Sequence, residues 1–275
     1  MVELVYERNQ MKNRHAVIFM AYNQVHEQHS LTVEALESIL AQDIGPLDIL
    51  AIDNGSTFTP TWEHFQMIRD MYLDGLTEIT FHCIHNRGNC SPVKMINRAI
   101  DYWFERGHEK VIFVPNDVIL PKNFYRLMNA WPRGMVTASE IPTKNVPEMV
   151  ESQVVAVSEC TPMATALVRK WFHDALVAKD GYFLDENFTH YASDCDMALR
   201  MASCGIRGVQ LNIPYFHQGS ASWRLLPTAE QQRAITDVAD KDRAYFVKKW
   251  GFPVTDYEYG RLAQDINFRG KAATV

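Results

Sequence analysis

The chain has 275 residues, of which 47% are hydrophobic and 22% are charged, and its formal net charge is −6. This composition is typical of a folded globular protein and excludes a largely disordered chain. The acidic balance argues against tight, non-specific binding to nucleic acid, which depends on a broad positive surface.

The cysteines and the apolar runs indicate a cellular compartment. Five cysteines occur without any CxxC pair, a pattern that favours reduced thiols over a zinc ribbon or a disulfide framework. The N-terminal segment lacks the apolar core of a secretory leader, and no apolar run reaches the roughly 20 residues of a membrane span. We therefore expect a cytoplasmic protein, whose association with a membrane, if any, is peripheral.

Short apolar runs alternate with amphipathic segments in the first half of the chain. Strands are predicted at 16–21, 47–52, 77–84 and 111–114, and helices at 31–40, after Ser30 as a cap, and at 92–104. Continuous apolar runs are typical of strands buried on both faces, and the alternation of strand and helix predicts right-handed crossovers. The predicted fold class is therefore α/β, with a mostly parallel central sheet flanked by helices.

The second half of the chain is less regular. Clustered prolines predict loops and short strands between 134 and 166. Helices are predicted at 170–179 and from 193 to Gly205, a short strand at 209–211, and a long charged helix at 229–250 before a C-terminal tail. We therefore add a C-terminal helical extension to the predicted fold.

Small polar and acidic residues follow four predicted strands in succession. These strand ends are Tyr22-Asn23, Asp53-Asn54-Gly55-Ser56, Asn86-Arg87-Gly88-Asn89 and Asn116-Asp117. Any one of them fits a simple turn, but ligands bind beyond the carboxyl ends of strands in an open parallel sheet, and four such ends together favour a binding site. The chain has neither a GxGxxG nor a P-loop motif, so a bound phosphate would be neutralised by a cation on Asp117 or by Arg87.

The order of these segments resembles that of the inverting glycosyltransferase family 2, which has the GT-A fold, and in particular its rhamnosyltransferase-like members. The matching segments are AVIFMAYN at 16–23, ALESILAQ at 35–42, IDNGS at 52–56, NRG at 86–88, VPNDVILP at 114–121, FLDENF at 183–188, SDCDMALR at 193–200, FHQGSAS at 216–222 and KDRAYFVKKWG at 241–251. No single segment is specific, and the resemblance depends on their number and order.

The resemblance implies transfer of a sugar from a UDP- or dTDP-linked donor to an acceptor hydroxyl, with inversion. It implies that Asp53 contacts the nucleobase and that Asp194 is the catalytic general base, with a structural or acceptor-contact role for Asp196; the same two roles with Asp196 as the catalytic base are the alternative. It also implies a divalent cation, Mn²⁺ or Mg²⁺, held by Asp117 with His217. The nucleotide pocket would be lined by Ala21, Tyr22, Asn23, Asn54, Asn86, Arg87 and Asn116.

The sequence departs from the family pattern at two places. The D-x-D metal motif is here Pro115-Asn116-Asp117, so only its last carboxylate is present. The acidic residue that usually precedes the catalytic aspartate is here Ser193. The resemblance also implies a division into an arm at 1–13, a nucleotide-sugar-binding half at 14–121, an acceptor-binding and catalytic half of the same domain at 122–225, and the helix and tail at 226–275.

Two other functions fit parts of the pattern. A sugar-phosphate nucleotidyltransferase would carry a glycine-rich basic loop after the first strand, where this chain has Ala21-Tyr22-Asn23-Gln24. A non-catalytic nucleotide- or carbohydrate-binding protein would explain the loss of the first metal-binding carboxylate. The sequence leaves the acceptor open between a glycan, a lipid-linked sugar, a protein and a modified nucleic-acid base, and it leaves open a homodimer through the C-terminal helix.

Overall fold

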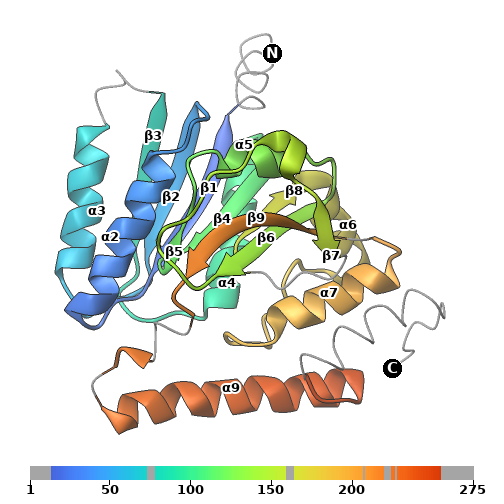
Figure 1. The fold of residues 1–275 in the computed structure, drawn as a ribbon. Helices are drawn as coiled ribbons and strands as arrows, with labels where there is room; N and C mark the ends of the chain where they lie inside the picture. Colours follow the sequence, from blue (N-terminus) through green and yellow to red (C-terminus); the bar gives the residue numbers. More distant parts are fainter. Residues whose placement is uncertain are drawn as a thin grey trace, which may run out of the picture.

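The computed structural model describes residues 14–72, 78–158, 164–206, 208–219, 224–226 and 228–254. Its centre is a nine-stranded sheet with the order β3-β2-β1-β4-β8-β6-β9-β5, and β7 pairs with β9 outside this path (Figure 1). The predicted arm at 1–13 and the tail after residue 254 lie outside the described residues.

The N-terminal half of the sheet is parallel. Its strands are β1 (His15–Ala21), β2 (Leu47–Asp53), β3 (Ile79–His85) and β4 (Lys110–Pro115). The register places Asp53 opposite both Ala21 and His85. The carboxyl ends of β1, β2 and β3 therefore meet at one edge of the sheet, as the sequence predicts.

Helices cover both faces of this half because successive side chains on each strand point to opposite sides. Val17 and Phe19 face α2 (His26–Leu40) and α3 (Pro60–Met71), whereas Ala16 and Ile18 face α4 (Pro92–Glu105). Figure 1 shows α2 and α3 together on one side of the sheet. The strands β1, β2 and β4 thus pack between two helical layers, which explains their largely apolar sequences, whereas β3 at the side of the sheet is more exposed.

The C-terminal half of the sheet mixes directions. It contains β5 (Val118–Ile119), β6 (Met135–Ile141), β7 (Ala156–Ser158), β8 (Ala166–Arg169) and β9 (Val209–His217). The helical elements around it are α5 (Phe124–Asn129), the 3₁₀ turn η1 (Glu151–Gln153), α6 (Lys170–Asp180) and α7 (Ser193–Ser203). The long pairings are mostly parallel and the antiparallel ones are short, so the predicted fold class is confirmed.

Several predicted boundaries need correction. The helix predicted to follow Ser30 begins at His26, and Ser30 lies inside it with its hydroxyl donating to the His26 carbonyl. The strand predicted at 209–211 continues to His217 because Pro214 lies where the register between β6 and β9 shifts, and proline is tolerated at such irregularities. The helix α3 was not among the predicted elements.

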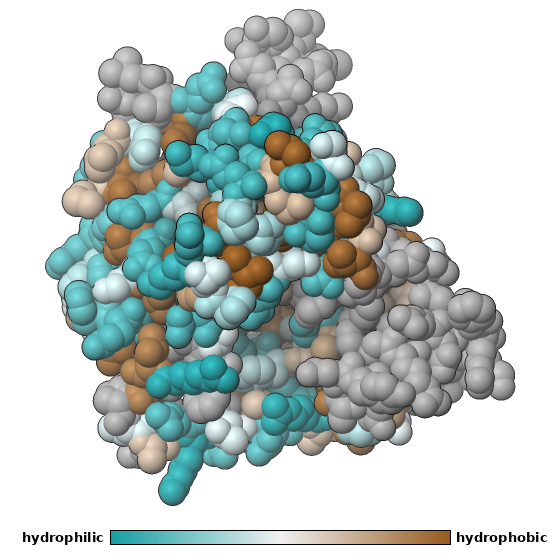
Figure 2. All heavy atoms as spheres, in the orientation of Figure 1, coloured by the Kyte–Doolittle hydropathy of each residue, from teal (hydrophilic) through white to brown (hydrophobic). Residues whose placement is uncertain are grey.

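The last helix, α9 (Ala229–Trp250), lies below α7 in Figure 1. Phe246 on α9 is fully buried, and Tyr245 packs edge-on against Phe188 at a ring-centroid distance of 4.8 Å. The part of the surface that faces the viewer at the position of α9 is largely hydrophilic in Figure 2. This long helix is therefore amphipathic. Among the described residues, no helix is long and apolar enough to cross a membrane.

Candidate active site

A network of amides and hydroxyls joins the ends of β1 and β4. Asn23 is fully buried, and its Nδ2 donates to Thr32 Oγ1 at 2.8 Å and to Thr61 Oγ1 at 3.0 Å. Its Oδ1 accepts from Asn116 Nδ2 at 2.9 Å, and its backbone N–H donates to Ser56 Oγ at 2.8 Å. Asn23 and Asn116 thus connect α2, α3 and two strand ends through hydrogen bonds.

Asp53 lies at the end of β2 and is fully buried. One carboxylate oxygen accepts from the Ser56 backbone N–H at 2.8 Å, and the other lies 2.9 Å from Nδ1 of His85. The His85 ring stacks at a tilt on Trp62, with ring centroids 5.0 Å apart, and its side chain is 38% exposed. At this strand end, solvent therefore reaches the side chain of His85, and the buried carboxylate of Asp53 contacts its Nδ1 from the protein interior.

Asn54 anchors the loop that follows β3. Its Nδ2 donates to Asn89 Oδ1 at 3.1 Å and to the Cys90 carbonyl at 2.8 Å, and its Oδ1 accepts from Asn86 Nδ2 at 2.9 Å. Asn54 is itself almost completely buried. The predicted pocket residues Asn54 and Asn86 are thus hydrogen-bonded to each other, and Asn54 also binds the rest of this loop.

The same loop lies directly against Gly55. This glycine has φ +85°, and a Cβ on it would stand 2.3 Å from the carbonyl carbon of Gly88. Arg87 is exposed beside this contact. Burial raises the pKa of the neighbouring Tyr22, against the opposing effect of a hydrogen bond with Asn89. The loop therefore presents Arg87 at the edge of the sheet while its own backbone is packed against β2.

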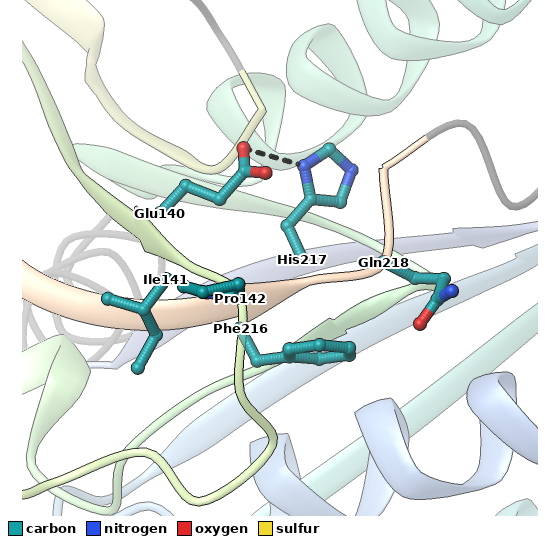
Figure 3. A pocket seen from close by; sticks show the side chains of 6 residues that line it. All are labelled: Glu140, Ile141, Pro142, Phe216, His217 and Gln218. Carbon is teal, nitrogen blue, oxygen red and sulfur yellow. Dashed lines mark hydrogen bonds and ion pairs between the residues drawn. The ribbon is translucent and has the colours of Figure 1, made fainter.

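Asp117 and His217 meet across the pairing of β5 with β9. The Nε2 atom of His217 lies 3.4 Å from Asp117 Oδ1. Its Nδ1 lies 3.1 Å from Glu140 Oε2, the contact drawn as a dashed line in Figure 3. Burial lowers the pKa of His217, but the hydrogen bonds and charges of Asp117 and Glu140 outweigh it and raise that pKa to about 9. A pocket of about 320 Å³ adjoins this group, and it is lined by Glu140, Ile141, Pro142, Phe216, His217 and Gln218.

Asp117 and His217 would hold a divalent cation once it displaces the imidazole proton that their contact stabilises, and the remaining ligands would come from phosphate. The carboxylate of Asp117 and Nε2 of His217 face each other. The carboxylate of Glu140 accepts from the other ring nitrogen, as carboxylates behind metal-binding histidines commonly do. No group of three or more His, Cys, Asp or Glu side chains suited to a metal occurs among the described residues. Mg²⁺ sites built from few protein ligands and substrate phosphates are common.

The two aspartates at the start of α7 differ sharply in environment. Asp194 is half-buried, and its carboxylate accepts from the Cys195 backbone N–H at 2.8 Å. Asp196 is fully buried, where it binds Arg200 Nε at 2.9 Å, Trp250 Nε1 at 2.9 Å and Lys249 Nζ at 2.7 Å. The environment of Asp196 suits a structural role. Asp194 is the carboxylate of the two that has access to solvent.

His190 links the two regions of the site. Although solvent reaches its ring, the surrounding protein desolvates it enough to lower its pKa, and the carboxylates of Asp242, Asp194 and Asp117 oppose this shift. The charges of Asp117, after β4, and of Asp194, on α7, therefore act on the same imidazole.

Four residues of this site were not predicted from the sequence: His85, Glu140, His190 and Asp242. His85 directly precedes Asn86 at a strand end, a signal that could have found it. Glu140 lies near the end of β6, a strand in a region that the sequence marks only by its prolines. His190 belongs to an irregular segment, and Asp242 is one of several carboxylates on a charged helix, so neither carries a signal of its own.

The sheet order, the helical layers on both faces and the polar edge together define a GT-A-type α/β fold, the fold of nucleotide-sugar glycosyltransferases. No family model and no curated protein matches the chain. The likeness to known proteins is therefore a likeness of structure.

Solved glycosyltransferase structures share this fold. The S. aureus TarS 1-349 complex with UDP has a TM-score of 0.52 at 14% identity, covering 94% of this chain and 80% of that one. The mannosyltransferase PcManGT from Pyrobaculum calidifontis, in complex with GDP-Man and Mn²⁺, has a TM-score of 0.56 at 16% identity, covering 93% and 69%. A longer structure of S. aureus TarS has a TM-score of 0.51 at 17% identity, covering 82% of this chain, which spans 42% of that structure's length.

Proposed function

We propose that the protein is an inverting glycosyltransferase that moves a sugar from a nucleoside-diphosphate sugar to an acceptor hydroxyl. The observation that carries this proposal is the pair of Asp117 and His217, 3.4 Å apart at the carboxyl edge of the sheet, together with the half-buried carboxylate of Asp194 at the start of α7. One carboxylate suits the diphosphate and its cation, and the other suits the proton of an acceptor. Transfer requires both functions close to one carbon atom.

In the proposed reaction, Asp194 accepts the proton of the acceptor hydroxyl while the hydroxyl oxygen bonds to the anomeric carbon. The bond from that carbon to the diphosphate breaks on the opposite face, and the nucleoside diphosphate leaves with the electron pair. The configuration of the sugar is thereby inverted, and the proton on Asp194 passes to solvent. Asp194 suits this role because it is accessible, whereas the carboxylate of Asp196 is fully occupied by Arg200, Lys249 and Trp250.

Asp117 and His217 would hold a divalent cation together with the diphosphate of the donor. A cation bound there supplies positive charge to the leaving group. Glu140 keeps the imidazole of His217 turned so that Nε2 faces Asp117. Arg87 is a second source of positive charge for the phosphates, since it is exposed on a loop that Asn54 holds in place.

The nucleobase is proposed to bind at the ends of β1, β2 and β3, beside Tyr22 and His85. UDP and dTDP are the favoured donors because of the resemblance in sequence, and the similar TarS structure was solved with UDP. The similar mannosyltransferase carries GDP-Man, so a guanine nucleotide belongs in any test.

The decisive experiment measures thermal unfolding with UDP, dTDP, GDP and CMP, each with and without Mn²⁺ or Mg²⁺. A ligand at a hundred times its dissociation constant stabilises the folded state by about 2.7 kcal/mol, a readily measured rise in melting temperature. A rise with one diphosphate that depends on metal, and that Asp117→Asn removes, would support the proposed site. A rise without metal would transfer the neutralising role to Arg87 and its neighbours.

A non-catalytic nucleotide-binding protein is the second candidate. It is favoured by the presence of a single carboxylate in place of D-x-D and by the absence, among the described residues, of a metal group with three protein ligands. Such a protein would bind the nucleotide but would release no diphosphate from any nucleotide sugar. Release of diphosphate from UDP-, dTDP- or GDP-linked sugars therefore separates the two functions.

A further inference from the structure

The C-terminal helix reaches the candidate active site through one buried carboxylate. Asp242 on α9 is only 2% exposed. Its Oδ1 accepts from the backbone N–H of Thr189 at 2.9 Å, and its Oδ2 accepts from those of His190 at 2.8 Å and Tyr191 at 2.7 Å. Three consecutive amides thus converge on one side chain that is more than fifty residues away in the sequence. Hydrogen bonds to a charged acceptor are among the stronger ones in proteins.

The segment held by Asp242 leads directly into the turn that carries Asp194. The next residue, Ala192, has φ 60°, the left-handed conformation that a residue with a side chain adopts only under constraint. Its carbonyl accepts from the Asp196 N–H at 2.9 Å, which starts α7. The position of Asp194 at the head of this helix therefore depends on a strained residue that the preceding amides hold in place.

The same segment is fixed from the opposite side by the donor-binding half. The hydroxyl of Ser91, the N-cap of α4, donates to the Thr189 carbonyl at 2.8 Å. Ser91 follows immediately after the loop that Asn54 anchors through Cys90. The backbone amides of residues 189–191 thus bind Asp242 on α9, and the Thr189 carbonyl binds Ser91 on the donor-binding side. The chain that follows this segment carries Asp194, the proposed base.

We propose that Asp242 is a positioning residue for catalysis, which fixes the 189–191 segment and thereby sets the carboxylate of Asp194 against the donor. This proposal rests on the proposed transferase function. Asp242 touches neither donor nor acceptor in it, and acts through the backbone amides alone. The role of α9 is then to hold the catalytic half in its working geometry, in addition to covering apolar surface with Phe246 and Tyr245.

The chemistry of Asp242 makes the proposal testable. A carboxylate accepts hydrogen bonds at both oxygens, whereas asparagine keeps one acceptor oxygen and replaces the other with an NH2 donor. Asp242→Asn keeps the volume of the side chain but turns this NH2 group toward at least one of the three amides of the segment. The matched control is Asp240→Asn on the same helix, because Asp240 is exposed and pairs only with Arg243 among the interactions described.

The experiment measures diphosphate release from UDP-glucose, dTDP-rhamnose and GDP-mannose as the sugar is transferred to water, in parallel with melting temperature and donor KM. For Asp242→Asn we expect kcat to fall about 10- to 100-fold with little change in donor KM, since small misplacements of catalytic groups cost rates of this order. Asp240→Asn should retain the wild-type rate. If Asp242→Asn does not fold, Asp242→Glu replaces it, because it keeps the charge but displaces the segment by one methylene.

A double mutant separates positioning from a general loss of structure. In an Asp194→Asn background, Asp242→Asn should reduce kcat little further, because the group that it positions is already lost. Fully additive losses, or an unchanged kcat in folded Asp242→Asn protein, would overturn the proposal while leaving the transferase intact. A wild-type chain that releases no diphosphate from any of the three donors would instead overturn the transferase function itself, and the positioning role with it.

Discussion

Nδ1 of His85 lies 2.9 Å from the buried carboxylate of Asp53, so the two residues that end neighbouring strands act as one unit. A buried carboxylate accepts a hydrogen bond, and this assigns the proton of a neutral imidazole to Nδ1. Nε2 is then an acceptor on the exposed side of the ring. Such an acceptor suits the N3–H group of uracil or thymine, whereas N3 of cytosine is itself an acceptor.

We therefore expect His85→Ala to weaken UDP binding about five- to tenfold, the effect of losing one hydrogen bond of about 1 kcal/mol. Titration calorimetry with UDP measures this loss, and CMP should bind weakly to the wild type and the variant alike. His82→Ala is the matched control, since His82 lies on the same strand and packs against Trp103 on the other face. Equal affinity of His85→Ala and wild-type protein for UDP would exclude His85 from the base site.

Asp194 and Asp196 should respond in opposite ways to the same substitution. Asp194→Asn should reduce turnover by about 10²- to 10⁴-fold, the usual contribution of a general base, with nucleotide binding nearly intact. Asp196→Asn should instead lower stability by about 3–5 kcal/mol, because it removes one partner from a buried group of charges with Arg200 and Lys249. Steady-state kinetics and chemical unfolding of both variants check this pair. A loss of donor affinity that equals the loss of turnover in Asp194→Asn would contradict its role as the base.

The sequence predicts the strands well where apolar side chains face both helical layers, as in 16–21 and 111–114 of the parallel half. It predicts the positions of Asp53, Asn86 and Asp117 because strand ends are readable from the same runs. It does not predict which of these groups face solvent. The burial of Asp53 depends on His85, and that of Asp196 depends on Lys249 and Trp250, and these are tertiary contacts that local patterns do not encode.

The link between Asp242 and the 189–191 segment was hidden for a related reason. The segment has no apolar periodicity, and Asp242 lies among the charges of α9, where an acidic residue normally faces solvent. Only the docking of Phe246 and Tyr245 turns this position of the helix inward. Long-range polar contacts of this kind follow from the packing of helices, and they become visible only once the fold is known.

The start of β1 should make stability depend on pH. Burial, together with the charges of Lys110 and His108, lowers the pKa of His15 to about 4. In the unfolded chain this histidine takes up a proton near pH 6.5, whereas the folded chain resists protonation until about pH 4. Stability should therefore fall as the pH decreases from 6.5 to 4, by at most about 3 kcal/mol from this residue.

The variant His15→Gln isolates this contribution, because glutamine does not titrate. Unfolding by urea at a series of pH values should show a smaller loss of stability for the variant than for the wild type across this range. The effect is separate from that of the neighbouring Asp48, whose pKa is lowered to about 2 by hydrogen bonds with His108 and Arg14 that outweigh its burial. Stability from Asp48 is lost only below about pH 4, as the pH falls toward 2. Parallel curves for His15→Gln and the wild type above pH 4 would contradict the prediction.

Gly55 offers a test of the donor site that does not depend on catalysis. A Cβ at this position would meet the backbone of Gly88 and Asn89 at 2.3 and 2.6 Å, and backbone atoms cannot turn aside as a flexible side chain can. Gly55→Ala should therefore displace the loop that presents Arg87 and should abolish measurable binding of UDP. Gly205→Ala is the control, because Gly205 also has a positive φ, 68°, but has open space around its Cβ position. Both variants should lose about 1–2 kcal/mol of stability to backbone strain, but only Gly55→Ala should lose the nucleotide. If the two bind UDP equally well, the contact between Gly55 and the loop is not needed to form the donor site.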